Sequence, residues 1–461
     1  MAGTRLAAAA LVLALLLVGP RRGQAEAADL ARARARAGKA VDHYESLHAI
    51  PELLFDLPKT SAYVRSQLEK LPVEFDTEVA TSGVVAYVGR DKAKRQRAVM
   101  LRADMDALPV PEETDVPFKS THEGRGHMCG HDAHMAALLT AAELLVEDAK
   151  KKKGAFGKNY YAKLVFQPAE EGGAGARVMR DAHDILADVV AAFGVHVGPG
   201  FGKAQPYPTG NVFVKSGPML AAAGEFDITI TGHGTHGAAP HSGRDPIVCA
   251  SNVVMSLQHI VSRRMDPLDA AVVTVGSFHS GKAHNVIPSV ATLSGTFRAL
   301  KHATFASLEE TIKATTESAA LALGCTAEIR FHPDTAYPPT VLEPGATEAV
   351  RAAAKAVLGE DAVHEMAAPI MGAEDYSFFA ESVSSSFVFV GTANASLANE
   401  NYVNHHPKFR VDPAALPIAA ALHVASFHAL ADADEAGALG PGSNPEAPRG
   451  GVRAAPRRDE L

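Results

Sequence analysis

The chain has 461 residues, of which 47% are hydrophobic and 21% charged, and its net charge at pH 7 is -8. This length and composition predict a globular protein large enough for two domains. The negative charge argues against a nucleic-acid partner and against a basic membrane-binding surface.

The first residues have the pattern of a secretory signal peptide. Arg5 precedes an apolar run at 6–19, which is too short to span a bilayer comfortably. Small residues follow, with an A-x-A pattern at Ala25 and Ala27. We therefore expect residues 1–27 to be cleaved, which leaves no membrane segment; an uncleaved anchor is the alternative.

Helix and strand patterns then alternate, which predicts a doubly wound α/β sheet. An amphipathic helix starting with Pro is expected at 58–71. A long helix is expected from His131 to about Asp148, before the apolar strand at 162–168. The α/β pattern resumes after Pro333. The other strands and helices expected in this part of the chain lie at 84–89, 98–108, 346–358, 385–391 and 414–431.

Between these parts the order changes to strand, helix, two strands, helix and strand. This order predicts a small ferredoxin-like α+β domain at 218–332, inserted into a catalytic domain formed by 28–217 and 333–432. Its expected elements are 225–232, 246–264, 271–281, 289–300, 304–323 and 325–331.

The end of the chain, 433–461, is rich in Gly, Pro, Ala and Arg and is expected to be a disordered tail. Its last four residues, 458–461, read RDEL and resemble the address read by the KDEL retrieval receptor. Together with the signal peptide, this ending predicts retention in the lumen of the endoplasmic reticulum; a chance D-E-L ending is the alternative.

The three cysteines, Cys129, Cys249 and Cys325, are few and odd in number, which argues against a disulfide framework. Cys129 instead lies in GHMCGHDAHM, two residues before His131. A turn there can direct both side chains at one metal ion, whereas a capped turn without metal is the alternative reading.

Other polar residues follow apolar strands, where the functional crevice of an α/β sheet lies. Glu170 and Glu171 are adjacent, so one acid can bind metal while the other takes a proton from water. A solvated helix start would explain them equally well. His196 lies within an apolar strand, as core histidines also do, and Asp106 ends another. A histidine pair, His405 and His406, precedes a proline.

Nine motifs, in chain order from about residue 40 to 430, resemble one family of metal-dependent amidohydrolases. This family is related to the dinuclear metallopeptidases and includes the plant auxin-conjugate hydrolases, bacterial hippurate hydrolases and aminoacylases. The motifs are RADMDALP, GHMCGHDAH, FQPAEEGGAGA, GVHV, THGAAPH, HNVIP, GTFR, MGAEDY and HHPKF.

The resemblance implies a site for two divalent ions, with Cys129 as a bridging thiolate. Manganese is the expected metal, and zinc and cobalt are alternatives. Glu170 matches the general base that accepts a proton from the attacking water and later delivers it to the leaving amine. Asp106 matches a residue that orients a metal ligand. The implied ligands are Cys129, His131, Glu171, His196 and His405.

In the inserted domain, His236 matches a histidine that polarises the scissile carbonyl across a dimer, and Asn285 matches a second polar group near the substrate. Arg298 is either part of this group or holds the domain together. The resemblance thus implies that the inserted domain is a lid and that two subunits form a homodimer through it, although family members differ in whether they dimerise. Thr235 replaces a glycine that the family usually has before this histidine.

The predicted activity is hydrolysis of the amide bond of N-acyl amino acids. A conjugate of indole-3-acetic acid (IAA) with an amino acid is the leading substrate. The alternatives are hippurate hydrolysis or deacetylation of N-acetyl amino acids or N-acetyl-diaminopimelate. A binding protein on the same fold would lack ligands, but all five ligand residues and the base are present.

Overall fold

The computed structural model describes residues 28–200, 206–394 and 401–444. The expected signal peptide, 1–27, and the RDEL ending lie outside these residues. The chain divides into two compact units, and the smaller one consists of Pro218–Thr340 with Ala368–Ser377.

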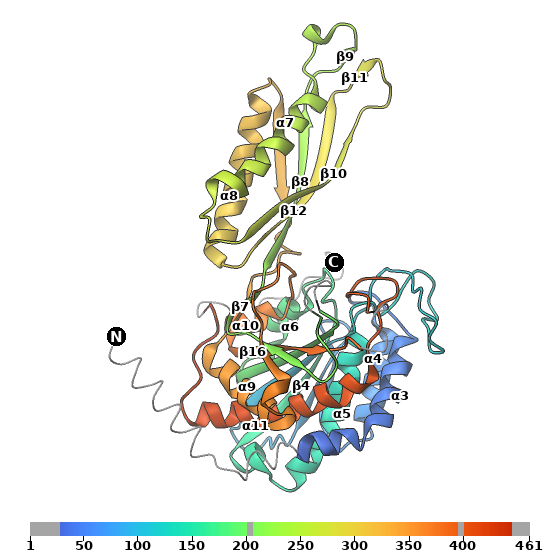
Figure 1. The fold of residues 1–461 in the computed structure, drawn as a ribbon, viewed down its shortest axis with the longest axis vertical. Coiled ribbons are helices and arrows are strands. Elements are labelled where there is room, and N and C mark those ends of the chain that lie inside the picture. The colour runs from blue at the N-terminus through green and yellow to red at the C-terminus, as the bar shows by residue number, and fades with distance from the viewer. Residues whose placement is uncertain (1–27, 201–205, 395–400, 445–461) are drawn as a thin grey trace, which may run out of the picture. The chain divides into compact units, whose positions relative to one another are not determined.

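Eight strands of the described chain form one mixed sheet in the larger unit (Figure 1). They are β1 (Glu74–Val79), β2 (Gly83–Val88), β3 (Arg97–Asp104), β4 (Tyr160–Gln167), β5 (Val189–Gly198), β6 (Val212–Val214), β15 (Val363–Glu365) and β16 (Ser384–Gly391). Their order is β1-β2-β4-β3-β5-β16-β6-β15. The central strands β4, β3, β5 and β16 are mutually parallel. The carboxyl ends of β3, β4 and β5 therefore meet at one edge, where the predicted acids and His196 are found.

Helices cover this sheet, which explains why β4 and β16 are buried along their whole length. Helix α5 packs against β3, while α11 contacts β5 and α9 contacts β16. The apolar stretch of α11 is long enough to cross a membrane, but 89% of it is buried inside the protein, as in a core helix. The helices are α3 (Ala37–His48), α4 (Pro58–Leu68), α5 (His131–Lys150), α6 (Gly175–His183), α9 (Pro344–Leu358), α10 (Ser377–Ser382) and α11 (Leu416–Glu435).

The smaller unit has the predicted order of strands and helices. Its four main strands form an antiparallel sheet in the order β10-β12-β8-β13, the ferredoxin-like arrangement. Along β8 buried and exposed residues alternate, because one face of the sheet packs on the helices. The elements are β8 (Ala222–Thr231), β9 (Thr235–His236), α7 (Pro246–His259), β10 (Ala271–Ser280), β11 (Val286–Ile287), β12 (Val290–Ala299), α8 (His302–Leu321) and β13 (Thr326–Phe331).

The predicted limits of the inserted domain need two corrections. The unit ends at Thr340 rather than at 332, because the chain leaves it only at β14 (Thr340–Leu342), which pairs with β7 (Gly217–Leu220). The segment Ala368–Ser377 also belongs to it. Arg298 helps to hold this segment, because its Nη1 donates to the carbonyl of Met371 at 2.9 Å.

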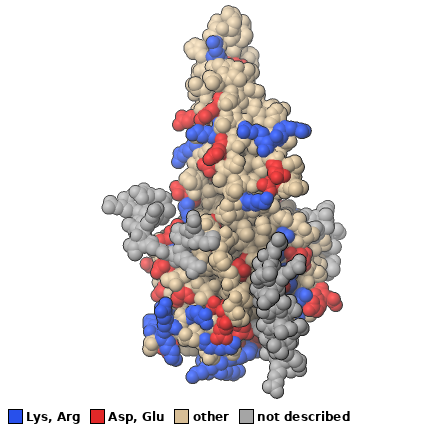
Figure 2. Space-filling model, turned by 90° about the vertical axis from the view of Figure 1, so that its left-hand side faces the viewer, with Lys and Arg blue, Asp and Glu red and all other residues tan. Residues whose placement is uncertain are grey.

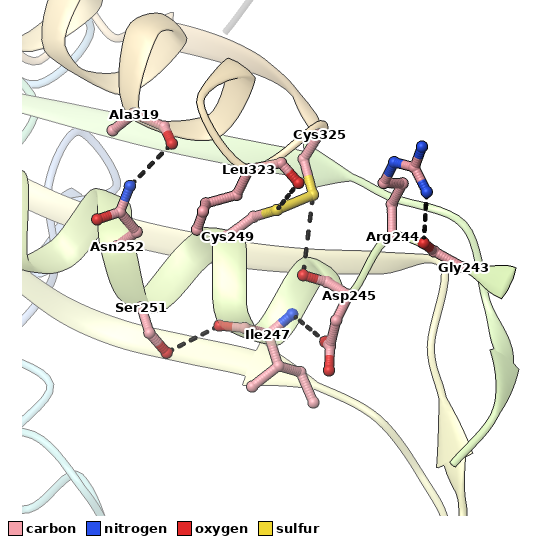
Figure 3. The surroundings of a disulfide bond; sticks show 10 residues. All are labelled: Gly243, Arg244, Asp245, Ile247, Cys249, Ser251, Asn252, Ala319, Leu323 and Cys325. Carbon is pink, nitrogen blue, oxygen red and sulfur yellow. Dashed lines mark hydrogen bonds between the residues drawn. A yellow bond between two sulfur atoms is a disulfide. The ribbon is translucent and has the colours of Figure 1, made fainter. Parts of the chain in front are cut away.

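The argument against a disulfide framework, which left Cys249 and Cys325 without a role, missed one bond. Cys249, on α7, and Cys325, just before β13, form a disulfide inside the smaller unit (Figure 3). Both side chains are buried in its core, 76 residues apart in sequence. The total count of cysteines was misleading, because Cys129 belongs to the metal motif and leaves an even pair in the inserted domain.

Replacement of both Cys249 and Cys325 by alanine is expected to destabilise the smaller unit by about 4 kcal/mol, since a closed loop of this length restricts the unfolded chain. Guanidinium unfolding of the variant and the parent protein would measure this loss. A difference below about 1 kcal/mol would show that the bond adds little to the packing around it.

A buried charged group joins α3 to the start of α5. His48 lies between two carboxylates, with Nδ1 2.6 Å from Asp132 and Nε2 3.2 Å from Glu112. Burial lowers the pKa of His48, but the hydrogen bonds to Asp132 and Glu112 outweigh it and raise this pKa to about 9. The imidazolium of His48, on α3, therefore links this helix to α5 through Asp132.

This arrangement predicts a pH-dependent stability. The pKa of His48 rises from about 6.5 in the unfolded chain to about 9, so the stabilisation, about 3 kcal/mol, is complete below pH 6.5 and is lost as pH rises through 9. Urea unfolding between pH 6 and 10 should show this fall in the parent protein and not in His48→Gln. His43→Gln is the control, because burial and the charge of Lys39 lower the pKa of His43 to about 4. Parallel stability curves for the parent and His48→Gln would contradict the assignment.

Surface charges are mixed in sign on the face shown in Figure 2, where Lys and Arg side chains lie among Asp and Glu side chains. Ion pairs also form at the protein surface, for example between Lys158 and both Asp432 and Glu435.

Candidate metal centre

The loop before α5 places two of the predicted ligands. Gly130, between Cys129 and His131, has a φ of +98°. A Cβ atom there would lie 2.5 Å from Cγ2 of Val197 on β5. Glycine is therefore required both by the backbone conformation and by the close contact with β5. The resulting turn presents the two side chains on either side of it to the sheet edge.

Asp106 holds the loop that carries the two acids. Its Oδ1 accepts from the backbone N–H of Glu170 at 2.9 Å, and its Oδ2 accepts from that of Glu171 at 3.0 Å. Its carbonyl oxygen is 2.7 Å from Nδ1 of His131. Asp106 is fully buried, so it is placed to orient ligands and the base rather than to meet a substrate.

The remaining two histidines come from β5 and from the loop before α11. Nε2 of His196 lies 3.5 Å from Sγ of Cys129, and Nε2 of His405 lies 3.2 Å from Oε1 of Glu171. The side-chain amide of Asn404 donates to the carbonyl oxygens of Cys129 and Val197, which ties this loop to the other ligands.

His405, rather than its neighbour, faces the site. It has a φ of +70°, unusual for a residue with a side chain, and its N–H donates to Met128. His406 instead stacks on Tyr402, with ring centroids 4.2 Å apart, and its Nδ1 accepts from the N–H of Lys408. The geometry thus favours the first histidine of the pair, as the resemblance implied.

The five predicted ligand residues meet in two groups that share Cys129. One group is Cys129, His131 and His196, and the other is Cys129, Glu171 and His405; the ligand atoms in each group lie within 4.8 Å of one another. Each group could hold one divalent ion, and Cys129 would be available to both. Glu170 lies beside them, with Oε2 3.9 Å from Nε2 of His131.

These residues fit a metal pair by a second criterion. Nε2 of His131 and Oε1 of Glu171 are buried, and among the described residues neither makes a hydrogen bond of good geometry, although Nε2 of His405 lies 3.2 Å from Oε1. Nδ1 of His131 is occupied by the Asp106 carbonyl, so the unsatisfied Nε2 is directed at the ligand groups. A cation coordinated there would satisfy both atoms.

Burial and the nearby acids together set the pKa values of Cys129 and His131. Burial raises the pKa of the Cys129 thiol well above its usual value, and the charges of Glu171 and Glu170 add to this. Burial lowers the pKa of His131, but Asp104, Asp106 and Glu171 outweigh it and raise this pKa to about 10. Metal binding therefore displaces protons from both side chains.

A neighbouring cluster resembles a metal site but is already saturated. Asp104 accepts from Nδ1 of His134 at 2.6 Å and from Nη1 of Arg102 at 2.7 Å. Nε2 of His134 accepts from the N–H of Val197 at 2.8 Å. Sequence reasoning did not assign these three side chains. Arg102 and Asp104 do lie in the motif RADMDALP, and His134 lies on α5 three residues, hence about one turn, after His131.

The two residues predicted in the inserted domain lie next to each other in the smaller unit. His236, on β9, pairs with Val286 on β11, and the carbonyl of Asn285 accepts from the N–H of Gly237. The N–H of Ala238 donates to Nδ1 of His236 at 3.0 Å. A neutral His236 ring therefore carries its proton on Nε2, which can donate a hydrogen bond.

A mixed α/β sheet that carries candidate ligands for two divalent ions, with a second acid beside them, fits a dinuclear metal hydrolase. A profile of the peptidase family M20/M25/M40 matches residues 100–428, and the chain belongs to this family. It is a hydrolase that acts on amide bonds.

Known relatives cover most of the chain. It is 41% identical over 379 residues to IAA-amino acid hydrolase ILR1-like 4 of Arabidopsis thaliana, a match that spans 82% of each protein. It is 36% identical over 396 residues to the N-acetyl-L-cysteine deacetylase of Bacillus subtilis, which spans 84% of this chain and 87% of that one.

A similar solved structure supports the dinuclear class. The YXEP protein of Bacillus subtilis, described as a dinuclear metal binding peptidase from the M20 family, is 29% identical. It superposes with a TM-score of 0.69 over 86% of this chain and 98% of that chain. The two ions supply charge that makes water more acidic and polarises a carbonyl.

Proposed function

We propose that this enzyme hydrolyses conjugates of IAA with amino acids and releases the free acid and amino acid. The supporting observation is its identity of 36–41% with four IAA-amino acid hydrolases of Arabidopsis thaliana, each over 82% of this chain. The five ligands and the adjacent acid supply the chemistry that amide hydrolysis needs.

In this proposal Glu170 is the general base. It takes a proton from the attacking water and returns it to the nitrogen of the leaving amino acid. Asp106 fixes the backbone on which Glu170 and Glu171 stand, so the base is held at a set distance from the ligands. Most of the Glu170 side chain is buried, which limits competition from bulk water.

His236 is proposed to donate a hydrogen bond from Nε2 to the developing oxyanion, with Asn285 as a second polar group near the substrate. His236→Ala is expected to lower kcat by about 10²–10³-fold, the range for removal of one oxyanion donor, and to leave metal content unchanged. Steady-state kinetics and metal analysis of the variant would measure both. An unchanged kcat, or a change in KM alone, would assign His236 to the loop structure.

The substrate is tested with a panel of indole-acetyl, benzoyl and acetyl amino acids, each assayed with Mn²⁺, Zn²⁺ or Co²⁺. The proposal expects the highest kcat/KM for an indole-acetyl amino acid, with Mn²⁺ as the most effective ion. Comparable preference for benzoyl amino acids would instead indicate hippurate hydrolysis.

N-acetyl amino acid deacetylation is a second candidate, favoured by the identity with the bacterial N-acetyl-L-cysteine deacetylase. An acetyl group is much smaller than an indole-acetyl group, so the same panel separates the two candidates. Higher kcat/KM for acetyl amino acids, including N-acetyl-diaminopimelate, would establish this alternative.

We also propose that the enzyme works in the lumen of the endoplasmic reticulum. The signal pattern and RDEL support this, and so does the disulfide between Cys249 and Cys325, because such bonds persist in oxidising compartments. Deletion of 458–461 should move the protein to the medium or the vacuole. Unchanged lumenal retention would show that the retrieval receptor does not read RDEL.

A homodimer through the smaller unit is the proposed assembly. It would allow His236 of one subunit to serve the metal centre of the other. Light scattering of the purified protein would give the mass in solution, and a monomer with full activity would exclude a role across subunits.

A further inference from the structure

We propose that Arg102, Asp104 and His134 form a buried support that positions His196 and His131, and that this support sets the affinity of one of the two metal positions. The inference concerns the ligands of the metal centre and does not depend on which amide is the substrate.

The support is a continuous path of hydrogen bonds. Nη1 of Arg102 donates to Oδ2 of Asp104, and Nδ1 of His134 donates to Oδ1 of the same carboxylate. His134 is thereby held with Nε2 as an acceptor, and it receives the backbone N–H of Val197 at 2.8 Å. Val197 follows His196 directly, so the orientation of that ligand's backbone depends on His134.

The same carboxylate faces a second ligand. Oδ2 of Asp104 lies 3.6 Å from Nε2 of His131, the nitrogen that points to the ions. His134 and His131 stack on α5 with ring centroids 5.5 Å apart, and the His134 and His196 rings meet at 4.8 Å. Asp104 and His134 are thus in contact with two members of the group formed by Cys129, His131 and His196, namely the two histidines.

Each hydrogen bond of this support matters because the support is buried. Arg102, Asp104 and His134 are each at most 1% exposed, so water cannot replace a lost hydrogen-bond partner without a large cost in free energy. Arg102 also donates from Nε to Oε1 of Gln167, the last residue of β4, at 2.8 Å. The guanidinium therefore neutralises Asp104 and links β3 to the strand that leads to the catalytic acids.

The support touches one metal position more closely than the other. The contacts reach His131 and His196, whereas Glu171 and His405, which complete the second group, contact each other. Loss of the support should therefore weaken one ion selectively. Changes in residues that only orient a ligand typically reduce metal affinity about 10- to 100-fold.

The experiment uses Asp104→Asn and His134→Gln in the full chain. Titration of the metal-free proteins with Mn²⁺ and Zn²⁺ against a chromophoric chelator would give both dissociation constants, with circular dichroism to establish folding. We expect one ion to bind about 10- to 100-fold more weakly and the other to bind as in the parent protein. We also expect kcat to recover at saturating metal, because the base Glu170 is intact.

Lys163→Met is the matched control. Lys163 lies on β4, is 4% exposed and pairs with Asp188 and the carbonyl of Ile185, away from the ligands. It should lose stability but keep both metal affinities. Parent-like affinities in a folded Asp104→Asn or His134→Gln variant would overturn the proposal. So would equal weakening of both ions, or weakening of either ion in Lys163→Met.

Discussion

Replacement of Glu170 by Gln is expected to lower kcat by about 10²–10⁴-fold while both metal ions remain bound. Glutamine has the shape of glutamate but cannot accept the proton of the attacking water. The backbone N–H of Glu170 would still be held by Asp106, so the side chain would stay in place. The loss should therefore appear in turnover and not in folding or metal content.

Glu171→Gln is the matched control for this result. It changes the neighbouring acid in the same way, but Glu171 is one of the five predicted ligands, with Oε1 3.2 Å from Nε2 of His405. This variant should lose metal, whereas Glu170→Gln should keep it. Native mass spectrometry and kinetics would test the pair together. Near-parent activity in Glu170→Gln would refute its role as base.

Replacement of Cys129 by Ala is expected to remove metal from both positions and to abolish detectable turnover. Cys129 is the only described residue shared by the two ligand groups, so its loss leaves each ion with two of its three protein ligands in these groups. Chelator competition should show weakened binding of both ions, unlike the variants of the Arg102 support.

Cys129→Ser separates charge from geometry. Serine keeps the size of the side chain, but its hydroxyl remains protonated far more readily than a thiol and is a harder ligand. We expect weak binding that favours Mn²⁺ over Zn²⁺. If Cys129→Ala retains two ions with parent affinity, as shown by intact-protein mass spectrometry, Cys129 does not bridge them.

The five candidate ligands were named because their motifs resemble those of one enzyme family. From the residues alone, Cys129 and His131 are close in sequence, and Glu170 and Glu171 follow an apolar run. Strand ends that converge in a parallel sheet account for the meeting of the two acids with His196, but not for His405, which lies in a loop. The order of elements in the inserted domain was predictable for a similar reason, since the period of the hydrophobic pattern changes there.

The parts that were not predicted depend on pairings that leave no local pattern. The partner of Cys249 is 76 residues away, and the path from Arg102 to Val197 crosses three elements. Arg102 and Lys163 both lie in apolar strands and look alike in sequence. Only the structure shows that Arg102 bonds to Asp104 and Gln167, whereas Lys163, on the neighbouring strand, pairs with Asp188.

The interruption of the larger unit by the smaller one has a consequence for biosynthesis. Cys129, His131, Glu171 and His196 all precede the insertion, whereas His405 follows it. As the chain is synthesised from its N-terminus, the smaller unit is complete at Ser377, so Cys249 and Cys325 can be joined while the main sheet still lacks β16. His405, the last candidate ligand, is made only when synthesis is nearly finished, so an ion held by the group of Cys129, Glu171 and His405 would be bound in a late step of maturation.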